Sequence, residues 1–323
     1  MEIRLSNPRG FCAGVRMAIE IVDEILDVMD ADENLYVYHE IVHNYHVVER
    51  LKERGAIFVD SILEIPESSV VVFSAHGVSQ EIKKQAEDRA LICIDATCPL
   101  VTKVHAEAIR YAKRGWQIIL IGHRDHQEII GTHGQAPDAI QILESPEGID
   151  ELHIIDPEAL VYLTQTTLSI DDAEVIIDAL KKAFPTIHAP PSDDICYATT
   201  NRQIAVRDDA PLADLVLVVG SQNSSNSLRL TEISITAGTP SFLIDDVSLL
   251  KPEWFDGVEH VLLTAGASAP ERLVTDIVEH LTTHYDGCLI ESSPVKEGMS
   301  FSMPASHQLF LQNKDITVEG NSQ

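Results

Sequence analysis

The sequence lacks the features that would place it on a membrane or on nucleic acid. Lys and Arg number 23 against 51 Asp and Glu, so the formal net charge is −28. A field of that sign repels nucleic-acid phosphates and anionic membrane surfaces, and neither partner is expected. The longest apolar runs, such as residues 215–219, fall far short of the roughly 18 residues of a membrane helix. Residues 1–6 alternate like a strand and lack the apolar segment of a secretion signal, so we expect a cytoplasmic protein.

Cysteine is also scarce, and its spacing excludes several kinds of metal site. The chain has five cysteines and no Cys-x-x-Cys pair, which excludes a zinc ribbon and a ferredoxin-type run. An odd number of cysteines in a chain expected in the cytoplasm favours free thiols or metal ligands over disulfides.

What the sequence does contain is a regular alternation of β-rich runs and helix-period segments. This pattern predicts an α/β protein with mainly parallel sheets and helices on both faces of them. The clearest expected strands are residues 70–73, 118–121, 161–163, 215–219 and 260–263, and the clearest expected helices are residues 80–89 and 101–113.

Small polar residues occupy the junctions between expected strands and helices. The junctions are residues 74–77, 122–126, 164–167, 220–226 and 264–268. Ligands of open α/β sheets bind beyond the carboxyl ends of the strands, where helix N-termini offer free N–H groups to anions. The pattern therefore predicts one site assembled from several junctions. The alternative is that these residues only cap helices and turn the chain.

Three cysteines share one setting, a polar turn just ahead of an expected helix. Cys12, Cys98 and Cys196 recur at intervals of roughly ninety residues, which predicts three similar α/β units with boundaries near Cys98 and Cys196. The expected division is residues 1–97, 98–195 and 196–285. A tail of residues 286–323 is expected to wrap irregularly, with residues 313–323 frayed.

These three cysteines are also the candidate metal ligands. A helix N-terminus favours thiolate, the form that binds metal, whereas Cys93 and Cys288 lie in apolar strands and are expected to pack in the core. Three thiolates suit a cubane iron–sulfur cluster with one iron left open. Unrelated buried thiols, or a cysteine nucleophile with a histidine base, remain as alternatives.

A carboxylate accompanies the junction histidines. Glu128 follows His126 by two residues and precedes an apolar pair, so it could donate a proton inside a closed cavity. The plainer alternative is a first-turn glutamate that only favours the helix dipole.

The motifs that contain these residues closely resemble those of one family, the 4-hydroxy-3-methylbut-2-enyl diphosphate reductases, also called the IspH/LytB family. They are residues 7–15 (NPRGFCAGV), 41–44 (IVHN), 74–78 (SAHGV), 95–99 (DATCP), 164–168 (TQTTL), 196–203 (CYATTNRQ), 220–226 (GSQNSSN) and 264–268 (TAGAS). The resemblance runs from about residue 1 to 285 in the family's order, and the tail adds nothing to it.

The resemblance implies a trefoil of three α/β units around a central 4Fe-4S cluster. Cys12, Cys98 and Cys196 would hold the cluster and leave one iron open, and Glu128 would supply a proton. The residues implied to bind the substrate are His43, His76, His126, Thr166, Ser224, Ser225, Asn226 and Ser268. Two positions depart from the family pattern: Gln127 stands where proline is common, and Arg16 where aspartate is common.

The activity implied is the reductive removal of an allylic hydroxyl group. It converts (E)-4-hydroxy-3-methylbut-2-enyl diphosphate to isopentenyl and dimethylallyl diphosphate, the last step of the non-mevalonate isoprenoid pathway. Electrons would come from a one-electron donor protein such as ferredoxin or flavodoxin. Two other classes stay open: a non-catalytic iron–sulfur sensor, which has no use for the polar loops, and a metal-independent hydrolase, which leaves the three cysteines unexplained.

Diphosphate binding in so acidic a chain is expected to depend on short-range donors, since basic residues are sparse in the junctions. Moderate salt should therefore leave the affinity for the diphosphate unchanged or slightly increased. If His43 and His76 titrate near their ordinary pKa, affinity should fall as the pH rises through roughly 6 to 8.

Overall fold

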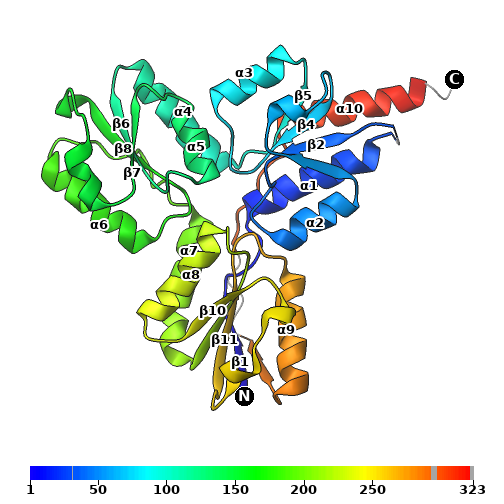
Figure 1. Cartoon of the computed structure of the whole chain (residues 1–323), viewed down its shortest axis with the longest axis vertical. Helices are drawn as coiled ribbons and strands as arrows, with labels where there is room; N and C mark the ends of the chain where they lie inside the picture. Colours follow the sequence, from blue (N-terminus) through cyan, green and yellow to red (C-terminus); the bar gives the residue numbers. More distant parts are fainter. Residues whose placement is uncertain (31, 292–296, 321–323) are drawn as a thin grey trace.

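Three lobes meet at the centre of the molecule and give it a trefoil outline (Figure 1). The structure is a computed structural model and describes residues 1–30, 32–291 and 297–320. Each lobe contains one sheet, and every strand pairing recorded within the three sheets is parallel. The predicted α/β class with mainly parallel sheets is confirmed.

The first lobe contains a four-stranded sheet in the order β3-β2-β4-β5. Its strands are β2 (Leu35–Tyr38), β3 (Ala56–Val59), β4 (Val70–Phe73) and β5 (Ile92–Asp95). Its helices are α1 (Ala13–Val28), α2 (Tyr45–Glu53) and α3 (Gln80–Asp88).

The second lobe contains a three-stranded sheet in the order β7-β6-β8. Its strands are β6 (Gln117–Ile121), β7 (Ile140–Leu143) and β8 (Leu160–Thr164). Its helices are α4 (Pro99–Lys113), α5 (Gln127–His133) and α6 (Ile170–Ala183).

The third lobe contains a five-stranded sheet in the order β10-β9-β11-β1-β12. Its strands are β1 (Glu2–Leu5), β9 (Leu215–Val219), β10 (Ser241–Ile244), β11 (His260–Ala265) and β12 (Cys288–Glu291). Its helices are α7 (Tyr197–Asp209), α8 (Ser225–Thr236) and α9 (Glu271–His284). Short 3-10 helices lie in the connections, at Ile62–Glu64, Pro146–Glu151, Pro157–Ala159, Ala210–Leu212, Val247–Leu249 and Pro252–Phe255.

The apolar strand runs are explained by burial on both faces of each sheet. Along β4, Val70 and Val72 pack into a cluster with α1, whereas Val71 and Phe73 pack into a separate cluster on the opposite face. Alternate residues of a strand point to opposite faces, so a sheet covered on both sides needs a nearly continuous apolar run. The other two sheets likewise separate two apolar clusters each.

The two ends of the chain differ from the sequence-based expectation. β1 pairs with β11 and β12, so the first strand belongs to the five-stranded sheet of the third lobe and not to the first lobe. The division of the chain at Cys98 and Cys196 stays a proposal. The expectation of an irregular tail is wrong, because the tail forms β12 and α10 (Ala305–Gly320), and α10 contacts α1 and β5. The helix also replaces the expected fraying up to Gly320, and residues 321–323 lie outside the described residues.

Cys288 is a further correction. It was expected in the core, but it lies exposed on β12, which is an edge strand paired on one side with β1. Its neighbours Leu289 and Ile290 are also exposed, so this apolar run marks the sheet edge rather than its centre. Cys93 is half-buried and packs against the cluster that contains Val71.

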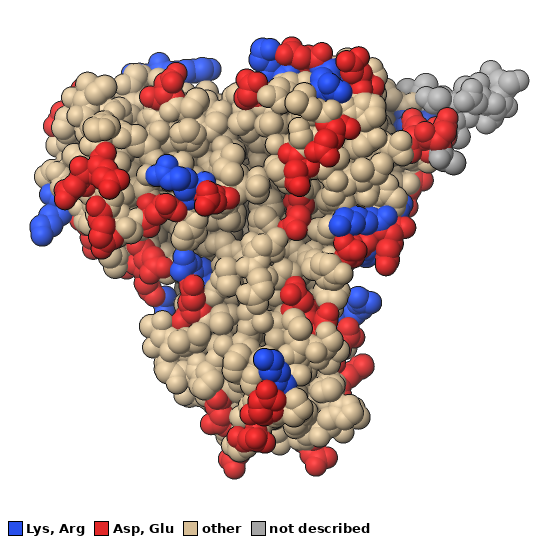
Figure 2. Space-filling model, in the orientation of Figure 1, with Lys and Arg blue, Asp and Glu red and all other residues tan. Residues whose placement is uncertain are grey.

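Acidic side chains are spread over all three lobes on the face drawn in Figure 2, and the fewer basic side chains lie mostly beside them. This distribution fits a solvated acidic surface rather than one basic docking face. Among the helices that the structure describes, none combines the length and apolar composition needed to cross a lipid bilayer.

Candidate active site

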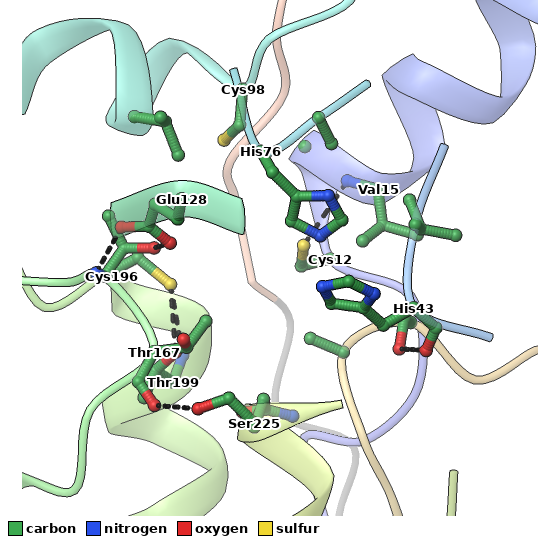
Figure 3. Close-up of a pocket in the computed structure, with 18 of the residues that line it drawn as sticks. Cys12, Val15, His43, His76, Cys98, Glu128, Thr167, Cys196, Thr199 and Ser225 are labelled. Atoms are coloured by element: carbon green, nitrogen blue, oxygen red, sulfur yellow. Dashed lines mark hydrogen bonds between the residues drawn. The ribbon is translucent and has the colours of Figure 1, made fainter. Parts of the chain in front are cut away.

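Three cysteines from different parts of the chain face one pocket at the centre of the trefoil (Figure 3). Each lies at the N-cap position of a helix: Cys12 of α1, Cys98 of α4 and Cys196 of α7. The Sγ of Cys12 accepts the Val15 N–H at 3.5 Å, and the Sγ of Cys196 accepts the Thr199 N–H at 3.4 Å. The helix starts thus hold at least two of the three sulfur atoms in position.

The remaining residues predicted for the site line the same pocket. They are His43, His76, His126, Glu128, Thr166, Ser224, Ser225, Asn226 and Ser268. The predicted assembly of one site from several junctions is therefore found in the structure. Among the described residues that line the pocket, none is Lys or Arg.

The thiols fit a multi-iron group better than a single ion. A Cβ on Gly14 would lie 2.6 Å from the Sγ of Cys98, so this glycine keeps space free beside the sulfur. Within the described part of the chain, no three Cys, His, Asp or Glu side chains converge closely enough for one metal ion. Thiolates are the usual ligands of iron–sulfur clusters, whose several irons let the ligands stand further apart.

A helix N-terminus is expected to favour the thiolate form, but burial has the larger effect at Cys98 and Cys196. Burial raises the pKa of Cys98 to about 12 and that of Cys196 to about 11. Both thiols are therefore protonated in the protein alone, and a bound cation must compensate for the loss of solvation when they ionise.

Three imidazole rings form a cluster on one side of the pocket. His43 follows β2, His76 follows β4, and His126 is the N-cap of α5. The rings of His43 and His76 stack with centroids 4.0 Å apart, and the ring of His126 lies edge-on to both, with centroids at 5.4 and 6.0 Å.

Burial changes the expected titration of these histidines. Burial and repulsion from His43 hold the pKa of His126 at about 3, and the same causes hold the pKa of His76 well below 6.5. The expectation that His76 titrates near 6.5 is therefore wrong for the free protein. Both rings are neutral at pH 7 before a ligand binds.

Glu128 lies in the first turn of α5 and is only 2% exposed. Its carboxyl group accepts the Thr166 N–H at 2.6 Å and the Thr166 hydroxyl at 2.8 Å. Burial raises the pKa of Glu128 to about 7, although these two hydrogen bonds act in the opposite direction. A buried carboxyl group that keeps a proton near neutral pH and faces the pocket is suited to general acid catalysis.

The two departures from the family pattern are accommodated locally. Gln127 is the first residue of α5, where a proline is tolerated because the N–H has no acceptor within the helix. Without the proline, the start of α5 is held by a hydrogen bond in which the Nδ1 of His126 accepts the Glu128 N–H at 3.1 Å. Arg16 is exposed and donates to the Phe11 carbonyl oxygen at 3.3 Å.

The opposite side of the pocket offers hydroxyl and amide groups at the N-terminus of α8. Ser224 caps the helix, and its Oγ lies 3.5 Å from the Oγ of Ser268, which donates to the His43 carbonyl oxygen at 2.8 Å. Asn226 is 4% exposed, and neither its Oδ1 nor its Nδ2 has a partner among the described residues. Buried polar groups are normally hydrogen-bonded, so an unpaired amide that lines a pocket points to a polar ligand.

Two polar lining residues and one contact were not singled out from the sequence. Thr167 and Thr199 both lie in the pocket wall, and the Thr199 hydroxyl contacts the Sγ of Cys196 at 3.2 Å. The Tyr197 hydroxyl accepts the Ala13 N–H at 3.1 Å and so joins two cysteine turns. These residues are Thr167, Thr199, Tyr197 and Ala13. All four fall inside the motifs quoted above, so the motifs were the sequence signal that could have identified them.

Comparison with known proteins gives consistent matches over nearly the whole chain. The model of a family described as LytB protein matches residues 3–282. A 4-hydroxy-3-methylbut-2-enyl diphosphate reductase from Idiomarina loihiensis is 50% identical over 94% of this chain and 97% of its own length.

Two solved structures agree with this match. That of E-1-hydroxy-2-methyl-but-2-enyl-4-diphosphate reductase from Plasmodium falciparum has a TM-score of 0.92 and 38% identity, and covers 97% of this chain and 99% of that one. That of (E)-4-hydroxy-3-methyl-but-2-enyl diphosphate reductase, described as the terminal enzyme of the non-mevalonate pathway, has a TM-score of 0.61 and 29% identity, and covers 88% of this chain and all of that one.

The fold, the central pocket and these matches define an enzyme, an α/β oxidoreductase built from three lobes. The sensor and hydrolase alternatives are thereby removed. The chain belongs to the LytB protein family.

Proposed function

We propose that the chain reduces (E)-4-hydroxy-3-methylbut-2-enyl diphosphate to isopentenyl diphosphate and dimethylallyl diphosphate, the last step of the non-mevalonate isoprenoid pathway. The observation that carries this proposal is the composition of the central pocket. It joins three N-cap thiols, a buried carboxyl group with a pKa of about 7, and a set of histidine, hydroxyl and amide groups suited to a diphosphate.

Cys12, Cys98 and Cys196 would hold a 4Fe-4S cluster, with one iron free of protein ligands. When bound, the cluster supplies electrons one at a time and a Lewis-acidic iron for the substrate oxygen. A ferredoxin or flavodoxin fits the role of electron donor, because each carries one electron per encounter. The cytoplasmic location stays a prediction.

The diphosphate would bind between the histidine cluster and the N-terminus of α8. Helix N-termini attract phosphate through free N–H groups and the helix dipole. The Nδ1 of His126 is an acceptor, so the neutral ring has its proton on Nε2 and can donate into the pocket. Asn226, whose amide has no partner among the described residues, adds further donor capacity.

Glu128 and Thr166 would deliver the first proton. Reduction of the allylic alcohol consumes two electrons and two protons: the C–O bond breaks, the oxygen leaves as water, and a C–H bond forms at one of the two ends of the allyl group. Glu128 supplies the proton for the leaving oxygen, and the Thr166 hydroxyl holds the carboxyl group in place. Exclusion of bulk water by the three lobes protects the allylic fragment until the second proton arrives.

The test is an anaerobic assay of the holoenzyme with the allylic diphosphate and a chemically reduced viologen as one-electron donor, followed by product analysis. We expect consumption of two electrons per substrate and formation of both isomeric diphosphates. Release of inorganic phosphate, or no consumption of substrate by protein with a full iron content, would overturn the proposal.

A further inference from the structure

A carboxylate outside the pocket contacts one of the three histidines. The Oε2 of Glu40 lies 3.1 Å from the Nδ1 of His43, and the same oxygen accepts the side-chain N–H of Asn223 at 2.7 Å. Glu40 follows β2 in the first lobe, whereas Asn223 lies in the loop that leads into α8 in the third. We call this arrangement the Glu40 bridge.

The Glu40 bridge distinguishes His43 from its two neighbours. The Nδ1 of His126 accepts a backbone N–H, and the Nδ1 of His76 lies 3.4 Å from the Ser74 hydroxyl. Within the described part of the chain, neither ring has a carboxylate partner. An ionised carboxylate accepts only, so the Nδ1 of His43 must donate to it, and Nε2 is left for the pocket.

The consequence for phosphate binding follows from the tautomer. With its Nδ1 proton held by Glu40, a neutral His43 offers only an acceptor at Nε2, whereas the imidazolium offers a donor there. A ring that carries both protons can therefore bridge the Glu40 carboxylate on one side and a phosphate oxygen on the other. The hydrogen bond from His43 in turn lowers the pKa of Glu40, so this carboxyl group is ionised at neutral pH.

We propose that Glu40 is a positioning residue for substrate binding: it fixes the ring of His43 with Nδ1–H toward itself and Nε2 toward the diphosphate, and it ties that ring to the α8 loop through Asn223. The proposal rests on the function proposed above, since it assigns His43 a phosphate oxygen as its second partner. Carboxylates that orient histidine ligands at metal sites typically contribute 10–100-fold in affinity or activity.

The backbone at this position is specialised. His39, the residue before Glu40, has a φ of +57°, a left-handed conformation that is uncommon for residues other than glycine. The left-handed residue reverses the chain just after β2 and places Glu40 beside His43. Backbone of this kind occurs often at functional sites, where the surrounding structure maintains it.

The test compares Glu40→Ala, Glu40→Gln and a matched control in the anaerobic assay. The control is Glu24→Gln, which alters another carboxylate–histidine pair, with the Oε2 of Glu24 3.2 Å from the Nε2 of His307, outside the pocket lining. We expect Glu40→Ala to raise KM by roughly 10–100-fold with little change in kcat, because the lost interaction serves binding in ground and transition states alike. Glu40→Gln keeps an acceptor for Nδ1–H, so its KM should lie between those of the wild type and Glu40→Ala. Glu24→Gln should match the wild type.

A double-mutant cycle with His43→Ala separates positioning from a general structural effect. Once the ring is absent, Glu40→Ala should add nothing further to KM. Additive effects in the cycle, or an unchanged KM in both Glu40 variants, would overturn the proposal.

A readout that does not depend on the reaction keeps this test separate from the proposed function. The nitrogen-15 shifts of the His43 ring in ligand-free protein should report a proton on Nδ1 in the wild type and its loss or exchange in Glu40→Ala. A wild-type ring with its proton only on Nε2 would contradict the role of Glu40 even if turnover is normal. Absence of turnover with the expected ring tautomer would contradict the proposed function and leave the orientation of His43 established.

Discussion

Replacing Glu128 by glutamine removes the proposed proton donor while keeping its shape. The amide oxygen can accept the Thr166 N–H, and the amide nitrogen can donate to the Thr166 hydroxyl, so both contacts of the carboxyl group have counterparts. The substitution therefore changes charge and proton transfer with little change in packing.

The effect on stability can be worked out from the pKa of Glu128. Burial raises it from 4.5 to about 7, so the folded state binds this proton more tightly than the unfolded state does. Ionisation of this carboxyl group therefore lowers the free energy of unfolding progressively as the pH rises from about 4.5 to about 7. Above that range the destabilisation stays constant. At 1.36 kcal/mol per pKa unit, a shift of this size corresponds to about 3 kcal/mol.

Glu128→Gln should consequently be more stable than the wild type by about 3 kcal/mol at pH 8 and nearly equal to it below pH 5. The measurement is denaturant unfolding of both proteins, in the same cofactor state, between pH 4 and 8. In the turnover assay, the variant should lose about 10²–10⁴-fold in kcat and still bind substrate.

Two results would refute this reasoning. A stability difference that does not change with pH would show that Glu128 is ionised throughout or that its burial has no cost. A variant with near-normal kcat would show that another group protonates the leaving oxygen.

Four further outcomes follow from the geometry. Gly14→Ala should reduce the iron content of purified protein, although alanine usually stabilises a helix, because its Cβ would lie 2.6 Å from the Sγ of Cys98. Glu297→Ala should lower the free energy of unfolding by about 3–5 kcal/mol, because it leaves the fully buried guanidinium of Arg202 without its carboxylate. Asp88→Ala, which removes an exposed ion pair with Lys84, should leave the free energy of unfolding nearly unchanged in the same denaturation experiment. Moderate salt should leave the dissociation constant of the substrate unchanged or slightly lower, because no Lys or Arg is found among the described lining residues. A steady weakening with salt would contradict a site without these basic side chains.

The lobes and the pocket could be predicted because local signals determine them. Apolar runs such as residues 215–219 fit strands covered on both faces, and the turns at Cys12, Cys98 and Cys196 fit helix N-caps, so both were recognisable without knowledge of the tertiary arrangement. Parallel strands direct their carboxyl ends to one edge, which brings the following loops together.

The features that sequence reasoning missed depend on contacts between distant residues. Pairing of β1 with β11 joins residues about 260 positions apart, and nothing local in either strand specifies the partner. The same holds for Glu40 and Asn223, which interact across two lobes. The low pKa of His76 results from burial among other rings, which composition does not reveal.

The measurement that tests the central claim most directly is the iron content and visible absorbance of anaerobically purified protein and its cysteine variants. We predict a brown wild type with about four irons per chain, loss of iron and colour on serine substitution at Cys12, Cys98 or Cys196, and an unchanged spectrum for Cys93→Ser. Full iron content in all three pocket variants, or a colourless wild type after anaerobic reconstitution with iron and sulfide, would contradict it.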